Sequence, residues 1–281
     1  MNSSLPGFDL DAFVAATLAE DLGPGGDVTS AAVIPADARF TAVMDSRDAI
    51  VVAGLDIAAS FFRRLDPEVV IERLVTDGDK VPPGTDLMRL SGLARPMLTA
   101  ERSALNTVQH LSGVATLTRK YVDMIGGTGA RLLDTRKTIP GLRVLEKFAT
   151  RLGGAENHRM GLWDAAMIKD NHVAVAGSVA EAVRRARAAG IERIILEVDH
   201  IDQIEAGLAA GATHILLDNM GVDELRMAVA VVAGRARTEA SGGVNLDTIR
   251  AIAATGVDYV SVGRITQSAP AVDIGLDFAP A

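Results

Sequence analysis

The chain has no cysteine, which excludes several kinds of chemistry at once. It can form no disulfide bond, offer no thiolate nucleophile, and hold no zinc or iron–sulfur site built from cysteine ligands. A chain without disulfides also fits a reducing compartment. Any catalysis must therefore rely on other side chains.

Long apolar runs and a basic charge balance are lacking as well. No segment approaches eighteen uninterrupted apolar residues, and the N-terminus shows no basic region followed by an apolar run, so neither membrane insertion nor secretion is expected. The formal net charge is −8, with one tryptophan and two tyrosines. Nucleic-acid binding requires basic stripes and stacking aromatics, so it is disfavoured. We expect a cytoplasmic protein.

Hydrophobic residues make up 48% of the 281 residues, although aromatic residues account for only 4%. This combination favours a core of alanine, valine, leucine and isoleucine, of the α/β type. A chain of this length can bury a sizeable core in one barrel or two domains.

Cations are concentrated in one stretch of this acidic chain. Residues 131–169 contain eight lysines and arginines against four acids. Many of these cations stand beside turn residues, as in Asp134–Gly141 and Asn157–Gly161. A solvated helical face would instead interleave both signs, and loops at element ends are where sites are usually built. The stretch therefore predicts a pocket for a small, highly anionic ligand.

The first part of the chain reads as a mixed α+β lobe. Asp27 and Thr29 follow a glycine-rich breaker, and we interpret them as local caps rather than ligand contacts. Arg102, near the start of the last helix of this lobe, is interpreted from its residue type alone as an exposed helix charge. The expected helices are 8–20, 57–65 and 99–124, and the expected strands lie within 38–52 and 69–93.

Beyond residue 130 the pattern changes to short apolar runs alternating with helical segments. Such alternation is typical of βα units in a parallel sheet, and six strands predict a closed or nearly closed α/β barrel with its site at the C-terminal rim. Each run ends in polar residues or glycine, namely Asp134, Lys169, Glu197, Asp218, Ser241 and Gly263.

The last two strand ends carry glycines that would let backbone N–H groups approach a phosphate, although two ordinary tight turns would have the same composition. These are Gly242 and Gly243 after Ser241, and Gly263. Glu197 and Asp218 end consecutive strands. They could contact Mg²⁺, bind ribose hydroxyls or support a positive transition state, or they could pair with rim cations.

Further donors occur at two neighbouring positions. His158 and Arg159 lie in one loop, and Lys169 and His172 follow a strand. A lysine at a barrel strand end also leaves open a Schiff-base mechanism. No metal-ligand spacing involves these histidines, and residue type alone does not decide whether they are catalytic.

Several long motifs, in order along nearly the whole chain, strongly resemble the carboxylating nicotinate-nucleotide pyrophosphorylases, or quinolinate phosphoribosyltransferases. The motifs are 20–22 with 26–29, Leu133–Thr138 with Pro140–Arg143, 153–154 with 157–162, Ile168–His172, Leu216–Met220, Glu239–Gly243 and Asp273–Asp277. The resemblance implies a six-stranded α/β barrel (TIM-like, type II phosphoribosyltransferase) at 113–267. It also implies an N-terminal α/β sandwich domain at 1–112, joined by the tail 268–281.

The resemblance further implies an enzyme of NAD biosynthesis. It would transfer phosphoribosyl from phosphoribosyl pyrophosphate to quinolinate with decarboxylation, giving nicotinate mononucleotide, pyrophosphate and CO₂. The implied assembly is a homodimer in which Arg102 reaches the partner's pocket, which overturns the interpretation of this residue from its type alone.

The implied roles fall into three groups. The quinolinate carboxylates are assigned to Arg136, His158, Arg159 and Lys169 together with Arg102. The ribose and pyrophosphate, with Mg²⁺ held mainly through the substrate, are assigned to Lys137, Glu197 and Asp218. The 5′-phosphate is assigned to Ser241, Gly242, Gly243 and Gly263.

Two positions depart from the family pattern. Gln267 stands where many members have a histidine, which would leave a donor without charge. Ile195 stands where members often have an additional acid. Neither replaces a residue assigned to bond making.

Three alternatives stay open. The first is a relative with the same fold that acts on nicotinate or another pyridine carboxylate, or a molybdenum-transport-associated homologue. The second is a Schiff-base aldolase centred on Lys169. The third is a non-enzymatic phosphosugar sensor.

Overall fold

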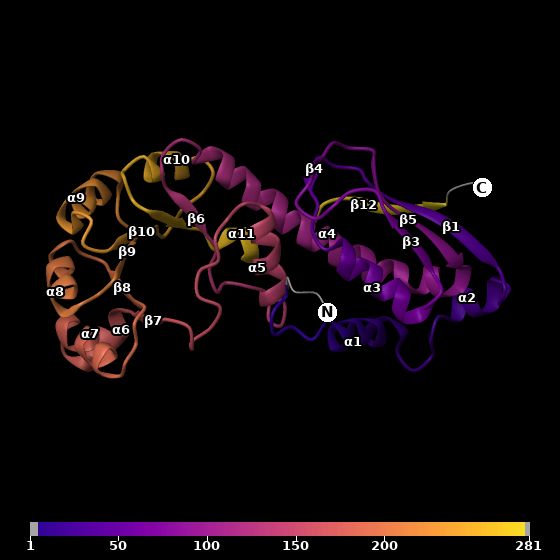
Figure 1. The fold of residues 1–281 in the computed structure, drawn as a ribbon, viewed down its shortest axis with the longest axis horizontal. Helices are drawn as coiled ribbons and strands as arrows, with labels where there is room; N and C mark the ends of the chain where they lie inside the picture. Colours follow the sequence, from indigo (N-terminus) through magenta and orange to yellow (C-terminus); the bar gives the residue numbers. More distant parts are fainter. Residues whose placement is uncertain (1–4, 279–281) are drawn as a thin grey trace. The chain divides into compact units, whose positions relative to one another are not determined.

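The computed structural model describes residues 5–278, which form two compact units (Figure 1). The N-terminal unit contains the described residues of Met1–Leu117, Val144–Gly153 and Ala269–Ala281, and the barrel unit contains Thr118–Arg143 and Gly154–Ser268. The boundary expected at 112/113 lies inside a helix, and the division between the two units falls in the same helix. Residues 1–4 and 279–281, which the expected first domain and its tail include, lie outside the described residues.

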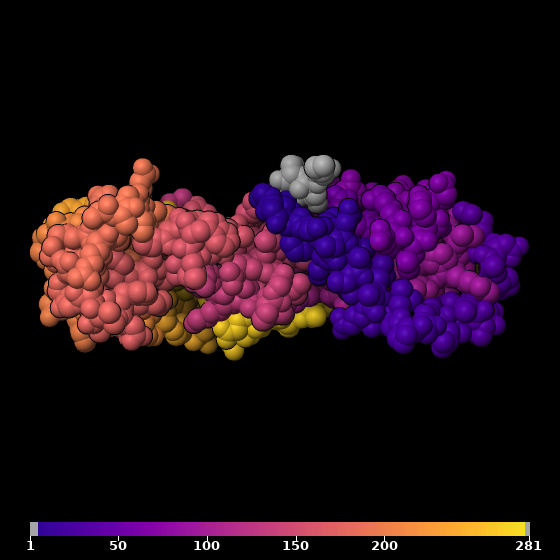
Figure 2. Space-filling model, turned by 90° about the horizontal axis from the view of Figure 1, so that it is seen from below, coloured from indigo at the N-terminus to yellow at the C-terminus, as the bar shows by residue number. Residues whose placement is uncertain are grey.

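The N-terminal unit is built on a four-stranded sheet in the order β12-β1-β5-β3, with all neighbours antiparallel. Figure 1 shows α1 and α3 on one side of this sheet, and Figure 2 shows the indigo atoms near the N-terminus on the surface. Its elements are α1 (Leu10–Leu22), α2 (Val28–Val33), β1 (Arg39–Ser46), β2 (Ile50–Val51), α3 (Leu55–Leu65), β3 (Val70–Arg73), β4 (Lys80–Val81), β5 (Thr85–Leu93), α5 (Arg143–Leu152) and β12 (Ile274–Phe278).

Helix α4 (Ala94–Met124) begins earlier than the sequence pattern indicated. Its apolar stripe is buried from Leu105 to Val114, whereas Leu117 and Val122 are half-buried. The predicted cap at Asp27 is confirmed, because one of its carboxylate oxygens accepts from the Ser30 backbone N–H at 2.9 Å. The other oxygen accepts from the Thr99 hydroxyl at 2.8 Å. Asp27 therefore caps α2, joins it to the first turns of α4 and has a structural role.

The barrel unit contains a parallel sheet in the order β6-β11-β10-β9-β8-β7. Helices α7, α8 and α9 cover its outer side in Figure 1. Its elements are β6 (Arg131–Leu133), β7 (Ala166–Ile168), α6 (Asp170–Ala176), α7 (Val179–Ala188), β8 (Ile194–Val198), α8 (Asp202–Ala210), β9 (His214–Asp218), α9 (Val222–Val232), β10 (Arg237–Ser241), α10 (Ile249–Ala253), β11 (Tyr259–Ser261) and α11 (Arg264–Gln267).

The edge strands of this sheet are β6 and β7. Glu156 forms an isolated parallel bridge with Leu133 beside β6, but among residues 5–278 no ladder joins this bridge to β7. A side chain spans part of the gap instead, since Arg159 Nη1 donates to the Ala165 carbonyl, just before β7, at 3.2 Å. The six predicted strands thus form one parallel sheet, with an open seam between its edge strands β6 and β7. In the described part of the chain, no helix is both long and apolar enough to cross a membrane.

Candidate active site at the carboxyl ends of the barrel strands

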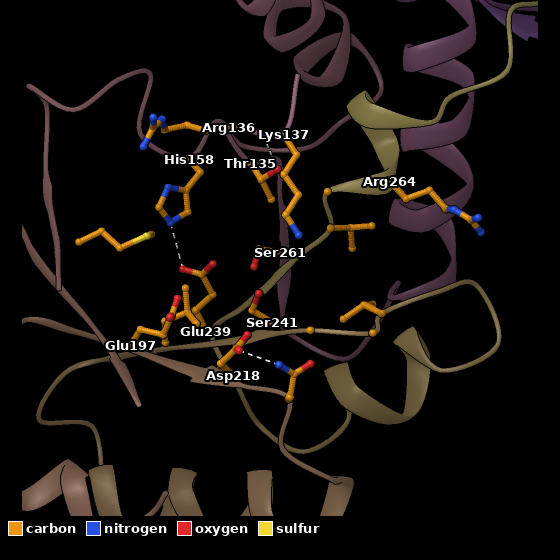
Figure 3. Close-up of a pocket in the computed structure, with 18 of the residues that line it drawn as sticks. Thr135, Arg136, Lys137, His158, Glu197, Asp218, Glu239, Ser241, Ser261 and Arg264 are labelled. Carbon is orange, nitrogen blue, oxygen red and sulfur yellow. Dashed lines mark hydrogen bonds and ion pairs between the residues drawn. The ribbon is translucent and has the colours of Figure 1, made fainter. Parts of the chain in front are cut away.

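A cavity of about 590 Å³ opens at the carboxyl ends of the barrel strands (Figure 3). The parallel ladder accounts for this position, because it brings the ends of all six strands to one rim. The lining includes the sequence-predicted residues Arg136, Lys137, His158, Arg159, Lys169, Glu197, Asp218, Ser241, Gly242, Gly243 and Gly263. Arg102 is not among the lining residues. It is an exposed residue of α4 in the N-terminal unit.

Two arginines give the cavity its cationic side. Arg159 is 7% exposed, and burial together with the charge of Arg136 lowers the pKa of its guanidinium. The Nε atoms of both arginines are buried without a hydrogen-bond partner. Buried donors without partners are costly unless a ligand satisfies them. These two side chains therefore suit a ligand with more than one anionic group.

The loop that carries His158 and Arg159 is held by a carboxylate at the end of β6. Asp134 is fully buried, and its oxygens accept from the His158 backbone N–H at 2.8 Å and from Asn157 Nδ2 at 2.6 Å. Asp164 holds the next turn by accepting from the backbone N–H groups of Met160 and Gly161. The arginine is thus presented by a loop whose backbone is fixed at both ends.

The lining of the cavity also contains Glu239, which was not among the predicted site residues. It is 1% exposed, and its Oε2 lies 3.3 Å from His158 Nε2. His214 Nε2 is 2.9 Å from the same oxygen, but the hydrogen-bond angle there is poor. Burial raises the pKa of Glu239, but the two histidines outweigh it and lower the pKa to about 2. The available signal was its spacing, since Glu239 and Ser241 are two residues apart on β10 and therefore share a face.

Lysine and carboxylate side chains face one another on the side of β7, β8 and β9. Lys169 Nζ lies 2.5 Å from Glu197 Oε2. Burial raises the pKa of Asp218, whereas Lys169, the Asn219 amide and Lys137 oppose that increase. An ammonium paired with a carboxylate is not a free amine nucleophile, so this geometry disfavours the Schiff-base alternative.

Two turns that contain glycine line the cavity at the carboxyl ends of β10 and β11. Gly242 and Gly243 both have positive φ, at 95° and 62°, so their backbone adopts conformations that favour glycine. At Gly263 a Cβ would come within 2.8 Å of Lys137 Cδ, so this glycine lets the lysine side chain cross the turn. The Thr266 hydroxyl donates to the Lys137 carbonyl at 2.6 Å and fixes the loop from which the lysine extends.

Three further residues named from the sequence are His172, Gln267 and Ile195, and only one of them lines the cavity. His172 Nδ1 accepts from the Lys169 backbone N–H at 3.0 Å, so it caps α6 and does not line the cavity. Gln267 is exposed and lines the cavity. Ile195 is fully buried against Ala165 and Leu216, so the departure from the family pattern there extends the apolar barrel core.

The carboxylate oxygens of the cavity suit a magnesium ion whose other ligands come mainly from a bound substrate. Among residues 5–278 no group of three metal-binding side chains occurs. Glu197 and Asp218, at consecutive strand ends, supply carboxylate oxygens to the cavity. Mg²⁺ commonly takes one or two carboxylates together with substrate phosphates and water. Two carboxylates beside glycine turns fit that arrangement.

Comparisons with known proteins point to one family over nearly the entire chain. Residues 27–112 match the family described as "Quinolinate phosphoribosyl transferase, N-terminal domain", and residues 114–277 match the corresponding C-terminal domain. The nicotinate-nucleotide pyrophosphorylase [carboxylating] of Mycobacterium leprae is 46% identical over 92% of this chain and 94% of its own length. A chloroplastic protein of that name from Oryza sativa is 39% identical over 96% of this chain and 78% of its own length.

Solved structures show the same likeness. The nicotinate-nucleotide pyrophosphorylase of Francisella tularensis matches with a TM-score of 0.93 and 38% identity, covering 99% of this chain and 100% of its own. The NadC structure from Streptococcus pyogenes matches with a TM-score of 0.92 and 37% identity, covering 96% of this chain and 97% of its own.

Proposed function

The chain belongs to the quinolinate phosphoribosyltransferase family, and we infer from this membership and from the cavity that it makes nicotinate mononucleotide. It transfers phosphoribosyl from phosphoribosyl pyrophosphate to quinolinate, and it releases pyrophosphate and CO₂. It is therefore a pentosyltransferase of NAD biosynthesis. The observation that carries this conclusion is the pair of arginines, the half-buried Arg136 and the buried Arg159, whose unsatisfied Nε atoms lie in one cavity with two phosphate-type glycine turns.

The cavity divides into parts that match the parts of the two substrates. Quinolinate has two carboxylates, and we assign these to Arg136, Arg159 and Lys169, with His158 beside them. Planar guanidinium groups bind carboxylates through paired, charge-assisted hydrogen bonds. The 5′-phosphate is assigned to the turns at Ser241–Gly243 and Gly263, where backbone N–H groups can approach it closely.

The main catalytic task of these residues is to stabilise the charges that develop as the phosphoribosyl group is transferred. The pyridine nitrogen already has a lone pair, so its attack on the ribose carbon needs no general base. As the bond to pyrophosphate breaks, the ribose becomes oxocarbenium-like. Glu197 and Asp218 are assigned to stabilise this positive charge, while Lys137 takes up charge on the leaving group. The side chains also hold both reactants in the orientation needed for attack.

Decarboxylation follows from the product of the transfer step. Once its nitrogen is bonded to ribose, the pyridine ring is cationic, so loss of the adjacent carboxylate as CO₂ leaves a carbanion beside positive charge. The carbanion then takes up a proton to give nicotinate mononucleotide. The arginines orient the ring through this step by holding the remaining carboxylate.

Three further features are part of this proposal. Mg²⁺, held mainly by the substrate and by Glu197 and Asp218, would neutralise pyrophosphate charge when bound. The assembly is a homodimer in which Arg102 reaches the quinolinate site of the partner subunit. The compartment is the cytoplasm.

The test is to incubate the protein with quinolinate, phosphoribosyl pyrophosphate and Mg²⁺ and to measure CO₂ and nicotinate mononucleotide together. Equal amounts of both products are expected. Nicotinate is the parallel substrate, since its turnover in place of quinolinate would transfer the assignment to another pyridine carboxylate. Saturable binding of both substrates without pyrophosphate release would point to a sensor and would contradict the proposal.

A further inference from the structure

Asn219 has a left-handed backbone conformation, which residues other than glycine adopt uncommonly and asparagine tolerates best among them. It follows β9 directly, and its φ is 56°, in the left-handed region. Among the described residues, the other non-glycine position with positive φ is Ala233, at the end of α9. A left-handed residue is cheapest as glycine, so an asparagine here suggests a use for its side chain.

The side chain and backbone of Asn219 contact two different parts of the cavity. Its Nδ2 donates to Asp218 Oδ2 at 2.6 Å. Its backbone N–H donates to the Ser241 carbonyl at 2.8 Å, one bond beyond the last register pair of β9 with β10. Asn219 thus connects the carboxylate at one strand end with the start of the glycine turn at the next. Figure 3 shows Asp218 and Ser241 next to each other.

The glycine turn is shaped to fit this asparagine. A Cβ on Gly242 would lie 2.1 Å from Asn219 Oδ1 and 2.8 Å from its backbone nitrogen. The space that a side chain at Gly242 would need is therefore filled by Asn219. Moving the asparagine would release the turn as well as the carboxylate.

We propose that Asn219 is a positioning residue that sets the spacing between Asp218 and the turn at Ser241–Gly243, and thereby fits the cavity to a 5-phosphoribosyl group. Asp218 would contact the ribose of that group, and the turn would contact its phosphate. Because Asn219 holds both Asp218 and the turn, it fixes the distance between these two contacts. This inference rests on the proposed function. It assigns Asn219 to the sugar donor and gives it no role toward the pyridine substrate.

The experiment compares the Michaelis constants of both substrates in wild-type protein and in Asn219→Gly. Glycine keeps the backbone conformation and removes the amide. The KM for phosphoribosyl pyrophosphate is expected to rise about tenfold, the effect of losing one hydrogen bond to a charged group. The KM for quinolinate is expected to stay within about twofold, since no described contact joins Asn219 to the arginines.

Two more variants make the comparison specific. Asn219→Asp keeps a residue that tolerates positive φ but places a second carboxylate against Asp218, so the KM for the sugar donor should rise further. Ala233→Gly is the matched control, because it relieves the other left-handed residue outside the cavity and should leave both constants unchanged. Melting temperatures of all variants show whether each protein is folded.

Two results would overturn the inference while leaving the proposed function intact. One is an unchanged KM for phosphoribosyl pyrophosphate in both Asn219 variants. The other is an equal rise in both Michaelis constants, which would indicate a general structural role. A wild-type protein that releases no pyrophosphate from these substrates would instead overturn the proposed function, and this inference with it.

Discussion

His158 Nδ1 accepts a hydrogen bond from the Arg159 backbone N–H at 2.7 Å, while its Nε2 faces the buried carboxylate of Glu239. A ring nitrogen that accepts from a backbone N–H carries no proton, so the proton of this imidazole is at Nε2. Both nitrogens are therefore engaged within the protein. In this geometry the imidazole holds the backbone that presents Arg159.

This arrangement predicts different effects for two substitutions of His158. His158→Asn keeps an acceptor at the position of Nδ1 and should retain more quinolinate affinity than His158→Ala. The difference should be about threefold to tenfold, which corresponds to one hydrogen bond. The measurement is the quinolinate dissociation constant by titration calorimetry. Equal losses in both variants would favour a direct contact between the imidazole and the substrate.

Glu239 should influence how stability depends on pH. Its pKa is lowered to about 2, so its contribution is present above the unfolded value of about 4.3 and is lost as the pH falls toward 2. The lost contribution is on the order of 3 kcal/mol. Between pH 5 and pH 2.5, Glu239→Gln should therefore lose less free energy of unfolding than the wild type in denaturant titrations.

The control for this measurement is Glu205→Gln. Arg235 lowers the pKa of Glu205 through an exposed pair, and exposed pairs contribute little to stability. This variant should follow the wild-type pH dependence. A Glu239→Gln protein with the same acid sensitivity as the wild type would show that the buried carboxylate contributes nothing in this range.

Quinolinate binding should depend on Arg136 far more than on an arginine outside the cavity. Arg136→Ala removes a half-buried cation whose Nε is buried and has no partner within the protein, so the KM for quinolinate should rise by on the order of a hundredfold, about 3 kcal/mol. Arg237→Ala is the matched control, because its guanidinium pairs with Asp258 at the other end of the strands. Steady-state kinetics with both variants would reject the assignment if their quinolinate constants were alike.

The strand ends were the most predictable part of this protein. The short apolar runs of the sequence identified the six barrel strands. The polar residues at the ends of these strands, such as Lys169 and Asp218, line one cavity. Helix α5 was not predicted, because its residues lie in the cation-rich stretch that was interpreted as loops. The seam beside β7 also has no sequence signal, since a side chain of Arg159 replaces backbone pairing there.

Glu239 and Asn219 illustrate a second limit of the sequence. Neither could be assigned a role, because each has a partner distant in sequence. Glu239 meets His158, and the backbone N–H of Asn219 meets Ser241 on the adjacent strand. The positive φ that distinguishes Asn219 is likewise a property of the fold. Residue type indicated which side chains could bind ligands, but the supporting contacts required the register of the sheet.

Asp134 should affect both stability and quinolinate binding. Asp134→Asn replaces an acceptor by a donor that faces Asn157 Nδ2, so at least one buried hydrogen bond is lost. The free energy of unfolding should fall by about 1–3 kcal/mol, and the KM for quinolinate should rise because the loop with Arg159 loosens. Asp258→Asn is the control. It removes a carboxylate that accepts from the Thr238 backbone, so it should lower stability without raising that KM.

The proposed dimer can be tested with two variants, because each active site would need residues from both subunits. Arg102→Ala should abolish quinolinate turnover while the protein stays folded, because an exposed arginine contributes little to stability. Lys137→Ala should also be inactive, through loss of a cation that lines the cavity. If each site combines the barrel of one subunit with Arg102 of the partner subunit, a hybrid dimer of the two variants contains one intact site.

Mixing the two inactive variants under conditions of subunit exchange should therefore restore activity. Random pairing makes half of the dimers hybrid with one working site each, so the expected recovery is about a quarter of wild-type activity. The control is the double variant Arg102→Ala/Lys137→Ala mixed with either single variant, which creates no intact site. Exchange is checked by mass spectrometry of differently labelled subunits. Hybrid dimers that form without regaining activity would place Arg102 outside the partner's site.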